Sequence, residues 1–274
     1  GRGDGTPRAP ASPAPAGAGR DGGVRGLGLL EICWKVIATI LTQRFTHSIE
    51  FHDSLHGFRP ARGTRTAIIE AKLFQQLAAI ERVPAFEIFL DLHKAYDAVD
   101  RGRLMEILEA YGVGPLTRTL LRNYWDAQKF VARQGGYYGR PFNLGRGLTQ
   151  GDPMSPILFN IVCDAVVGAW LRNFLPGSEA TTGIGGRIRD FIACFYADDG
   201  MVGARDADWL EHSFGVLVGY FARMGLECNT RKTESMTCLP GFIPRPLSDR
   251  ATRRRQEGQG DTFREHRRQR VLFD

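Results

Sequence analysis

Apolar residues recur three or four positions apart through much of the first third of the chain. One such pattern covers residues 29–49, and a second covers residues 66–82, where Pro84 follows and stops it. A turn rich in glycine and arginine, residues 57–65, separates the two patterns. The sequence therefore predicts two helices joined by a turn.

The next part of the chain mixes short apolar runs with helical patterns. Residues 86–90 are a short, mostly apolar run, typical of a buried strand that ends at Asp91. A longer apolar segment from Met154 to Phe174 predicts a helix, with Pro156 tolerated in its first turn. Between them we expect helices at 101–111 and 115–126, short strands near 128–133 and 137–144, and a loop at 145–153.

Two further apolar segments flank a pair of acidic residues. Residues 188–196 and 201–203 lie on either side of Ala197-Asp198-Asp199-Gly200. This pattern predicts a β-hairpin with the acids at its tip and Asp-Gly as its turn pair. A helix is expected from Asp206 to Met224. Strands and helices mixed without a strict βαβ alternation indicate an α+β layer fold.

The two ends of the chain differ in composition from the rest. Residues 1–23 consist almost entirely of Gly, Ala, Pro, Arg and Asp, which predicts a disordered leader. The arginine-rich stretch 247–270 predicts a solvated helix or a disordered tail, with contact to a nucleic-acid backbone as a less favoured alternative. The net charge of +6 divides into +2 on residues 1–25, +3 on residues 247–274 and about +1 on the remainder. Charge therefore permits nucleic-acid binding without requiring it.

Composition also bears on the cellular setting. The longest apolar stretch, residues 154–174, contains Asp164 and Arg172, so we expect no membrane span. The five cysteines are scattered, with no CxxC pair and no histidine at metal-ligand spacing. We therefore expect buried, reduced thiols in an intracellular protein, in either the nucleus or the cytoplasm.

Three acids occupy positions that suggest chemistry. Asp91 ends an apolar strand, while Asp198 and Asp199 share the tip of an apolar hairpin. Adjacent carboxylates repel, which costs stability unless a cation lies between them. Hard oxygen ligands suit Mg²⁺, and two such ions roughly 3.5–4 Å apart can activate a hydroxyl and stabilise a leaving oxygen in phosphoryl transfer. A lone Asp-Asp-Gly is more often a surface turn, and spacing alone leaves the two interpretations balanced.

The residues around these acids carry a resemblance to a known family. In their order and spacing, six segments are similar to motifs of reverse transcriptases of the non-LTR retrotransposon and group II intron type. The two fingers motifs are VRGLGLLEICWKVIATIL (24–41) and LHGFRPARGT (55–64), and the four palm motifs are FLDLHKAYDAVD (89–100), GLTQGDPMSPILFNIVCDAVV (147–167), FYADDG (195–200) and GLECNTRKTESM (225–236). The resemblance implies a right-hand polymerase with fingers, and a palm whose antiparallel sheet is backed by helices.

The resemblance also implies residue roles. Asp91 and Asp198 correspond to the ligands shared by two Mg²⁺ ions (Mn²⁺ being an alternative), with Asp199 beside them. Lys232 corresponds to a lysine that stabilises or protonates the departing pyrophosphate. The reaction so implied is extension of a primer 3′-hydroxyl with dNTPs on an RNA template, in which positioning and charge neutralisation do most of the work.

Further residues correspond to nucleotide-binding positions. Arg25 matches a fingers arginine on the triphosphate, and Tyr96 matches a bulky residue that lies under the incoming sugar and excludes a 2′-hydroxyl. Gln150 and Gly151 match the loop that holds the incoming nucleotide and the template strand. A glycine at 151 permits close approach of the backbone to a ligand.

The chain is expected to divide into three parts, and two other functions are possible interpretations of the sequence. We expect a leader at 1–23, fingers and palm at 24–240, and a basic tail at 241–274 that is a linker or the start of a missing thumb. Arg59 and Arg62 either contact template phosphate or belong to a solvated loop. An inactive or truncated palm that binds nucleic acid is one alternative, and an RNA-dependent RNA polymerase is a lesser one.

Overall fold

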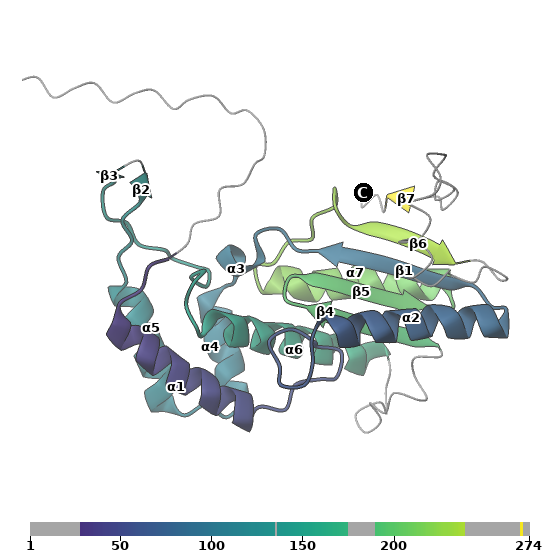
Figure 1. Cartoon of the computed structure of the whole chain (residues 1–274), viewed down its shortest axis with the longest axis horizontal. Coiled ribbons are helices and arrows are strands. Elements are labelled where there is room, and N and C mark those ends of the chain that lie inside the picture. Colours follow the sequence, from purple (N-terminus) through teal and green to yellow (C-terminus); the bar gives the residue numbers. More distant parts are fainter. Residues whose placement is uncertain (1–27, 135, 175–189, 239–268, 271–274) are drawn as a thin grey trace, which may run out of the picture.

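The computed structural model describes residues 28–134, 136–174, 190–238 and 269–270, and its elements are labelled in Figure 1. The helices are α1 (Ile32–Ser48), α2 (Thr64–Glu81), α3 (Ala95–Ala98), α4 (Arg101–Ala110), α5 (Pro115–Ala127), α6 (Ser155–Phe174) and α7 (Ala207–Arg223). The strands are β1 (Ala85–Asp91), β2 (Arg133–Gln134), β3 (Tyr137–Tyr138), β4 (Phe191–Tyr196), β5 (Asp199–Ala204), β6 (Glu234–Cys238) and β7 (Gln269–Arg270). The predicted leader, residues 1–23, and most of the predicted tail lie outside the described residues.

A five-stranded sheet with the order β4-β5-β1-β6-β7 forms the centre of the molecule. Every strand pair in it is antiparallel. β1 lies in the interior of the sheet and pairs with β5 on one side and β6 on the other. This interior position explains most of its apolar sequence, because Ala85, Ile88 and Leu90 are buried, while Phe89 remains 38% exposed.

Helices cover both faces of the sheet, and strand residues alternate between the two faces. Ala193 and Phe195 of β4 join the large core built with α6 and α7, whereas Ile192 and Cys194 join a smaller core under α2. This is the period of two expected for a strand. The observed arrangement is the predicted α+β fold, with an antiparallel palm sheet backed by helices.

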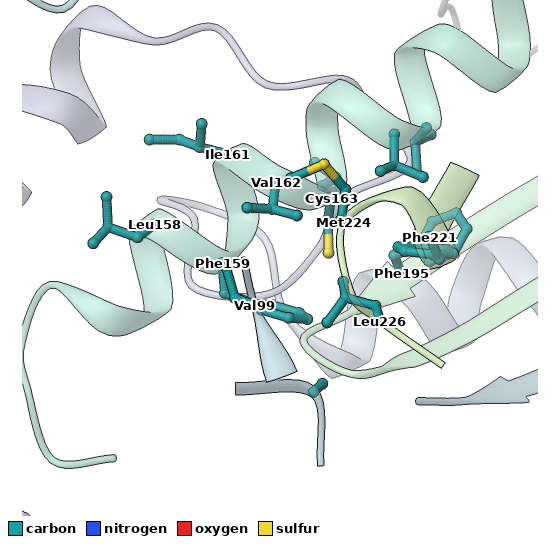
Figure 2. Close-up of a cluster of buried hydrophobic side chains, with 14 of the residues drawn as sticks. Val99, Leu158, Phe159, Ile161, Val162, Cys163, Phe195, Phe221, Met224 and Leu226 are labelled. Atoms are coloured by element: carbon teal, nitrogen blue, oxygen red, sulfur yellow. The ribbon is translucent and has the colours of Figure 1, made fainter. Parts of the chain in front are cut away.

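α6 is the most deeply buried helix of the large core. By length and composition it could cross a membrane, the only such helix among the described residues, but 67% of that window is buried inside the fold. Figure 2 shows Phe159, Val162 and Cys163 of α6 gathered beside Val99, Met224 and Leu226. The apolar character of α6 is therefore accounted for by burial against the other elements of the core.

The structure corrects several details of the sequence prediction. The loop of the β4–β5 hairpin is Ala197-Asp198, since Tyr196 pairs with Asp199, so the predicted Asp-Gly turn pair is wrong. The strands expected near 128–133 and 137–144 shrink to the two-residue β2 and β3, extended by a bridge between Phe130 and Phe142. Helix α3 and strand β6 were not expected, and β7 places two residues of the tail against β6 as a strand.

The thiols also differ in part from expectation. Cys163 and Cys194 are buried as predicted, but Cys33 is exposed, and Cys228 and Cys238 are half-buried. Burial raises the pKa of the Cys194 and Cys163 thiols, which keeps them protonated and unreactive at neutral pH.

One buried acid makes stability depend on pH. Glu87 in β1 has no exposed surface, and one of its carboxyl oxygens accepts a hydrogen bond from Gln75 Nε2 at 2.9 Å. Burial raises the pKa of Glu87 to about 7, against opposing effects of Gln75 and Arg205. A carboxyl whose pKa is raised on folding stabilises the fold fully only below its unfolded pKa, and that contribution is lost as pH rises through about 7.

Glu87→Gln is therefore expected to stabilise the protein at pH 8 by roughly 1–3 kcal/mol while changing little near pH 4.5. The amide keeps the shape and the polar contacts but carries no charge to desolvate. Urea denaturation at both pH values measures the difference, with the exposed Glu211→Gln on α7 as the matched control. Equal effects of the two substitutions at pH 8 would contradict the assignment of a buried, destabilising carboxylate.

Candidate active site

Three acidic residues lie at one end of the sheet. Asp91 is the last residue of β1 and lies directly opposite Asp199, the first residue of β5. Asp198 sits in the preceding turn, where its carbonyl oxygen accepts a hydrogen bond from Leu92 N at 3.3 Å. Antiparallel pairing places directly opposed Cα atoms about 4.5–5.5 Å apart. The register of β1 with β5 thus brings together acids that are far apart in the sequence.

The segment before β6 holds the Asp91 side chain in place. Asn229 Nδ2 donates to one carboxyl oxygen at 3.0 Å, and Lys232 Nζ approaches the other at 3.2 Å. The backbone is also tied, because Asn229 N donates to the Asp91 carbonyl oxygen at 2.8 Å. Lys232 was expected at the site, whereas Asn229 was missed, although it lies within the fourth palm motif.

A loop from the fingers supports the turn that carries Asp198. The loop forms a short parallel bridge with β4, in which His56 N donates to Phe195 O at 2.8 Å and Phe195 N to Ser54 O at 2.7 Å. A Cβ on Gly57 would lie 2.9 Å from the backbone nitrogen of Ala197. Only glycine permits this approach without a backbone shift, so Gly57 is a positioning residue that sequence analysis did not single out.

Tyr96 follows β1 and lies half-buried beside the carboxylates. Its ring stacks on Phe159 of α6, with centroids 4.7 Å apart and planes 20° from parallel. Burial raises the pKa of the Tyr96 hydroxyl, and the Asp198 charge raises it further. The side chain is therefore a fixed, neutral ring at one wall of the site.

The loop with Gln150 and Gly151 is fastened to the same wall. Leu148 N donates to Tyr96 O at 2.6 Å, and Gly147, at φ +87°, packs where a Cβ would lie 2.5 Å from Asp97 O. Gly151 itself has a φ of +99°, in the left-handed region that favours glycine. Gln150 is half-exposed, and its carbonyl oxygen accepts from Gly28 N at 2.8 Å. The two predicted loop residues thus belong to one rigid segment.

The two fingers arginines predicted to contact the template make contacts within the protein. Arg59 donates to the carbonyl oxygens of His52 and Leu55, at 2.7 and 2.8 Å. Arg62 pairs with Asp53, and its Nη1 lies 3.6 Å from Glu70. Both guanidinium groups therefore stabilise the fingers loop itself, and a template contact for either stays a prediction. Arg25 lies outside the described residues.

A polar cluster joins the fingers loop to the palm and was missed by sequence analysis. The fully buried His56 has Nε2 3.3 Å from a Glu70 oxygen, and Cys194 Sγ donates to the same oxygen at 3.7 Å. These three side chains come from the loop, α2 and β4. No spacing rule along the sequence could have found them, because only the tertiary fold brings them together.

The carboxylate set fits divalent metal ions of the hard type. Asp91, Asp198 and Asp199 offer only oxygen donors, and their mutual repulsion would be relieved by a cation between them. An ion on Asp91 would share or displace the contact of Lys232 with that carboxylate. The chain thus supplies ligands, and a mobile ammonium group, at the same point.

The fold and this arrangement define the class of the protein: the chain has the fingers and palm of the right-hand polymerase fold. The family model described as reverse transcriptase (RNA-dependent DNA polymerase) matches residues 17–266. The chain belongs to the reverse transcriptase family.

Known relatives support the assignment. The chain is 25% identical over 220 residues to a "Retrovirus-related Pol polyprotein from type-1 retrotransposable element R2" of Popillia japonica, covering 77% of the chain and 30% of that protein. It is 26% identical over 208 residues to the R2DM polyprotein of Drosophila melanogaster, covering 76% of the chain and 19% of that protein. The chain therefore spans less than a third of the length of either relative.

Solved structures agree on the fold. Apo telomerase of Candida tropicalis, truncated from its C-terminal domain, aligns with a TM-score of 0.56 over 77% of this chain and 42% of that one. The sequence identity is 14%, so this likeness concerns the fold alone.

Proposed function

We propose that the chain is the catalytic core of an RNA-directed DNA polymerase of a retroelement, which extends a primer 3′-hydroxyl with dNTPs. The observation that carries the proposal is the meeting of Asp91, Asp198 and Asp199 at one end of the palm sheet, with Lys232 against Asp91. Membership in the reverse transcriptase family and similarity to R2 polyproteins support the substrate class.

The proposed roles follow from the chemistry of each group. Two Mg²⁺ ions, when bound, would lower the pKa of the primer hydroxyl and neutralise charge on the leaving pyrophosphate. Asp91 and Asp198 would hold them, with Asp199 completing the anionic site. Asn229 fixes the Asp91 carboxylate, so that its orientation does not depend on the ligand. Lys232 would turn from Asp91 to the pyrophosphate, as its exposed, flexible side chain allows.

The nucleotide would lie between the carboxylates and the loop that holds Gln150. Tyr96 would form the floor under the sugar, and Gln150 and Gly151 would contact the nucleotide and the template base. A rigid loop suits this task, because catalysis of phosphoryl transfer depends mainly on positioning. RNA template, primer strand and dNTP are the partners that this arrangement requires.

The decisive experiment is primer extension on an RNA template with dNTPs and Mg²⁺, comparing the wild-type chain with Asp198→Asn. We expect template-dependent extension by the wild type and none by the variant. Equal activity in both proteins would exclude the two-metal assignment. Inactivity of both, with circular dichroism showing that both are folded, would contradict the proposal in favour of a non-catalytic nucleic-acid-binding palm.

A further inference from the structure

A projecting arm, residues 128–144, carries charge of one sign. Between Asp126 and Asp152 the chain has no acidic residue, but it has four cations, Lys129, Arg133, Arg140 and Arg146. All four are exposed. The first three belong to the arm and the fourth to the loop after it. Residues 26–246 as a whole, with these four cations included, carry a net charge of only +1, so the arm is a local concentration of positive charge.

The described residues of the arm, 128–134 and 136–144, are joined by backbone hydrogen bonds as in a hairpin. Phe130 and Phe142 exchange backbone hydrogen bonds of 2.8 and 2.9 Å, and Gly139 N donates to Ala132 O at 2.8 Å. The rings of the two phenylalanines lie 6.0 Å apart. Figure 1 shows β2 and β3 at the far end of this hairpin, standing away from the five-stranded sheet. The arm thus holds its side chains out into solvent in a defined arrangement.

Two aromatic side chains are exposed at the end of the arm. Tyr137 is 84% exposed and Tyr138 is 69% exposed. The Arg133 guanidinium lies 5.5 Å from the centre of the Tyr138 ring, close enough for a cation–π interaction. Neither ring contributes to the hydrophobic core. Surfaces that bind single-stranded nucleic acid typically combine exposed aromatic side chains with nearby cations.

The root of the arm is tied to the proposed nucleotide-binding loop. Arg101 Nη1 donates to Leu144 O and Arg101 Nε to Gly147 O, both at 2.8 Å. The Arg101 guanidinium also lies 5.2 Å from the centre of the Trp125 ring on α5. A strand held by the arm would therefore be held at a fixed place relative to Gln150 and Gly151.

We infer that the arm binds unpaired RNA, and this inference rests on the proposed function because the strand it would hold is the template. Tyr137 and Tyr138 stack on bases, while Arg133, Arg140 and Lys129 contact phosphates. Unpaired RNA fits better than a duplex, because only unstacked bases expose their faces to an aromatic side chain. It also fits better than a protein partner, because four cations without a single acid match a polyanion.

The test is the affinity of the full-length chain for a fluorescent 20-nucleotide oligouridine, measured by anisotropy without dNTPs. The double variant Tyr137→Ala/Tyr138→Ala is expected to bind this single strand about tenfold more weakly than the wild type, or more weakly still. Its affinity for an RNA duplex of equal length is expected to stay close to that of the wild type. Tyr137→Phe/Tyr138→Phe keeps both rings and should bind like the wild type. Arg133→Gln/Arg140→Gln should reduce the slope of log affinity against log salt by about 1.4.

Three results would overturn the inference. The first is a double alanine variant that binds the single strand as tightly as the wild type. The second is a double alanine variant that loses affinity for single strand and duplex equally. The third is a double alanine variant that keeps its RNA affinity but loses self-association, as measured by light scattering. Because the tyrosines are exposed, their substitution is expected to leave the melting temperature unchanged, which excludes unfolding as the cause. Failure of the proposed function is distinguishable, since primer extension could be absent while single-strand binding still depends on the arm.

Discussion

Asp91→Asn is expected to reduce primer extension by about a thousandfold or more, the effect of losing roughly 4 kcal/mol of transition-state stabilisation. The substitution removes one negative charge from the proposed metal site while keeping the shape of the side chain. The Asn229 contact with one side-chain oxygen can survive. The ion pair with the largely exposed Lys232 is lost, but such exposed pairs contribute little to stability. The loss of activity should therefore come mainly from metal binding.

Thermal denaturation separates these two causes. The wild-type melting temperature should rise on addition of Mg²⁺ or Mn²⁺, because an ion that binds only the folded state stabilises it. In Asp91→Asn this rise should disappear, while the metal-free melting temperature stays the same or increases through relief of repulsion with Asp198 and Asp199. Glu211→Gln, the same change on an exposed part of α7, should behave like the wild type. A metal-dependent shift that survives in Asp91→Asn would place the ions elsewhere.

The helices and the apolar strands could be predicted because burial imposes a period on the sequence. The long helix ending at Phe174 was identified from its apolar residues, and burial in the core accounts for that composition. The resemblance to reverse transcriptase motifs implied that Asp91 and the two acids of the hairpin belong to one site. The register that places Asp91 opposite Asp199 is a property of the sheet and cannot be read from either segment alone.

The misplaced hairpin turn shows why a local rule failed. Asp-Gly favours a turn because glycine adopts positive φ, but here Ala197 has the positive φ of 55°. Gly200 is required for another reason, since a Cβ there would lie 2.8 Å from the Phe195 ring. Cross-strand packing thus determined where the glycine lies. Such packing is invisible until the strands are paired.

The supporting residues of the site were the least predictable. Gly57, Asn229 and the cluster of His56 with Glu70 and Cys194 act through contacts between segments distant in the sequence. Arg59 and Arg62 illustrate the converse, because their charge suggested a polyanion while their hydrogen bonds lie within the fingers loop. Residue type indicated the reacting groups, and only tertiary structure identified the residues that orient them.

Tyr96→Ala is expected to increase incorporation of rNTPs relative to dNTPs by about 10- to 100-fold. The Tyr96 ring stacks on Phe159, and the Tyr96 carbonyl oxygen accepts a hydrogen bond from Leu148 N. The side chain therefore cannot readily move aside for a 2′-hydroxyl. Alanine would leave space for that hydroxyl. Competition between the two nucleotides in primer extension on one RNA template measures the change.

Tyr96→Phe is the matched control, because it keeps the ring and removes only the phenolic oxygen. Discrimination by the phenylalanine variant should remain near the wild-type value. Discrimination by the wild type should not vary between pH 6 and pH 9, because burial raises the pKa of Tyr96 above its usual value of about 10. If alanine leaves discrimination unchanged, the ring does not exclude the 2′-hydroxyl. A wild-type protein that prefers rNTPs would instead support the RNA-dependent RNA polymerase interpretation. The ratio of nucleotides therefore tests the substrate class independently of the metal site, since it depends on space beneath the sugar and not on charge.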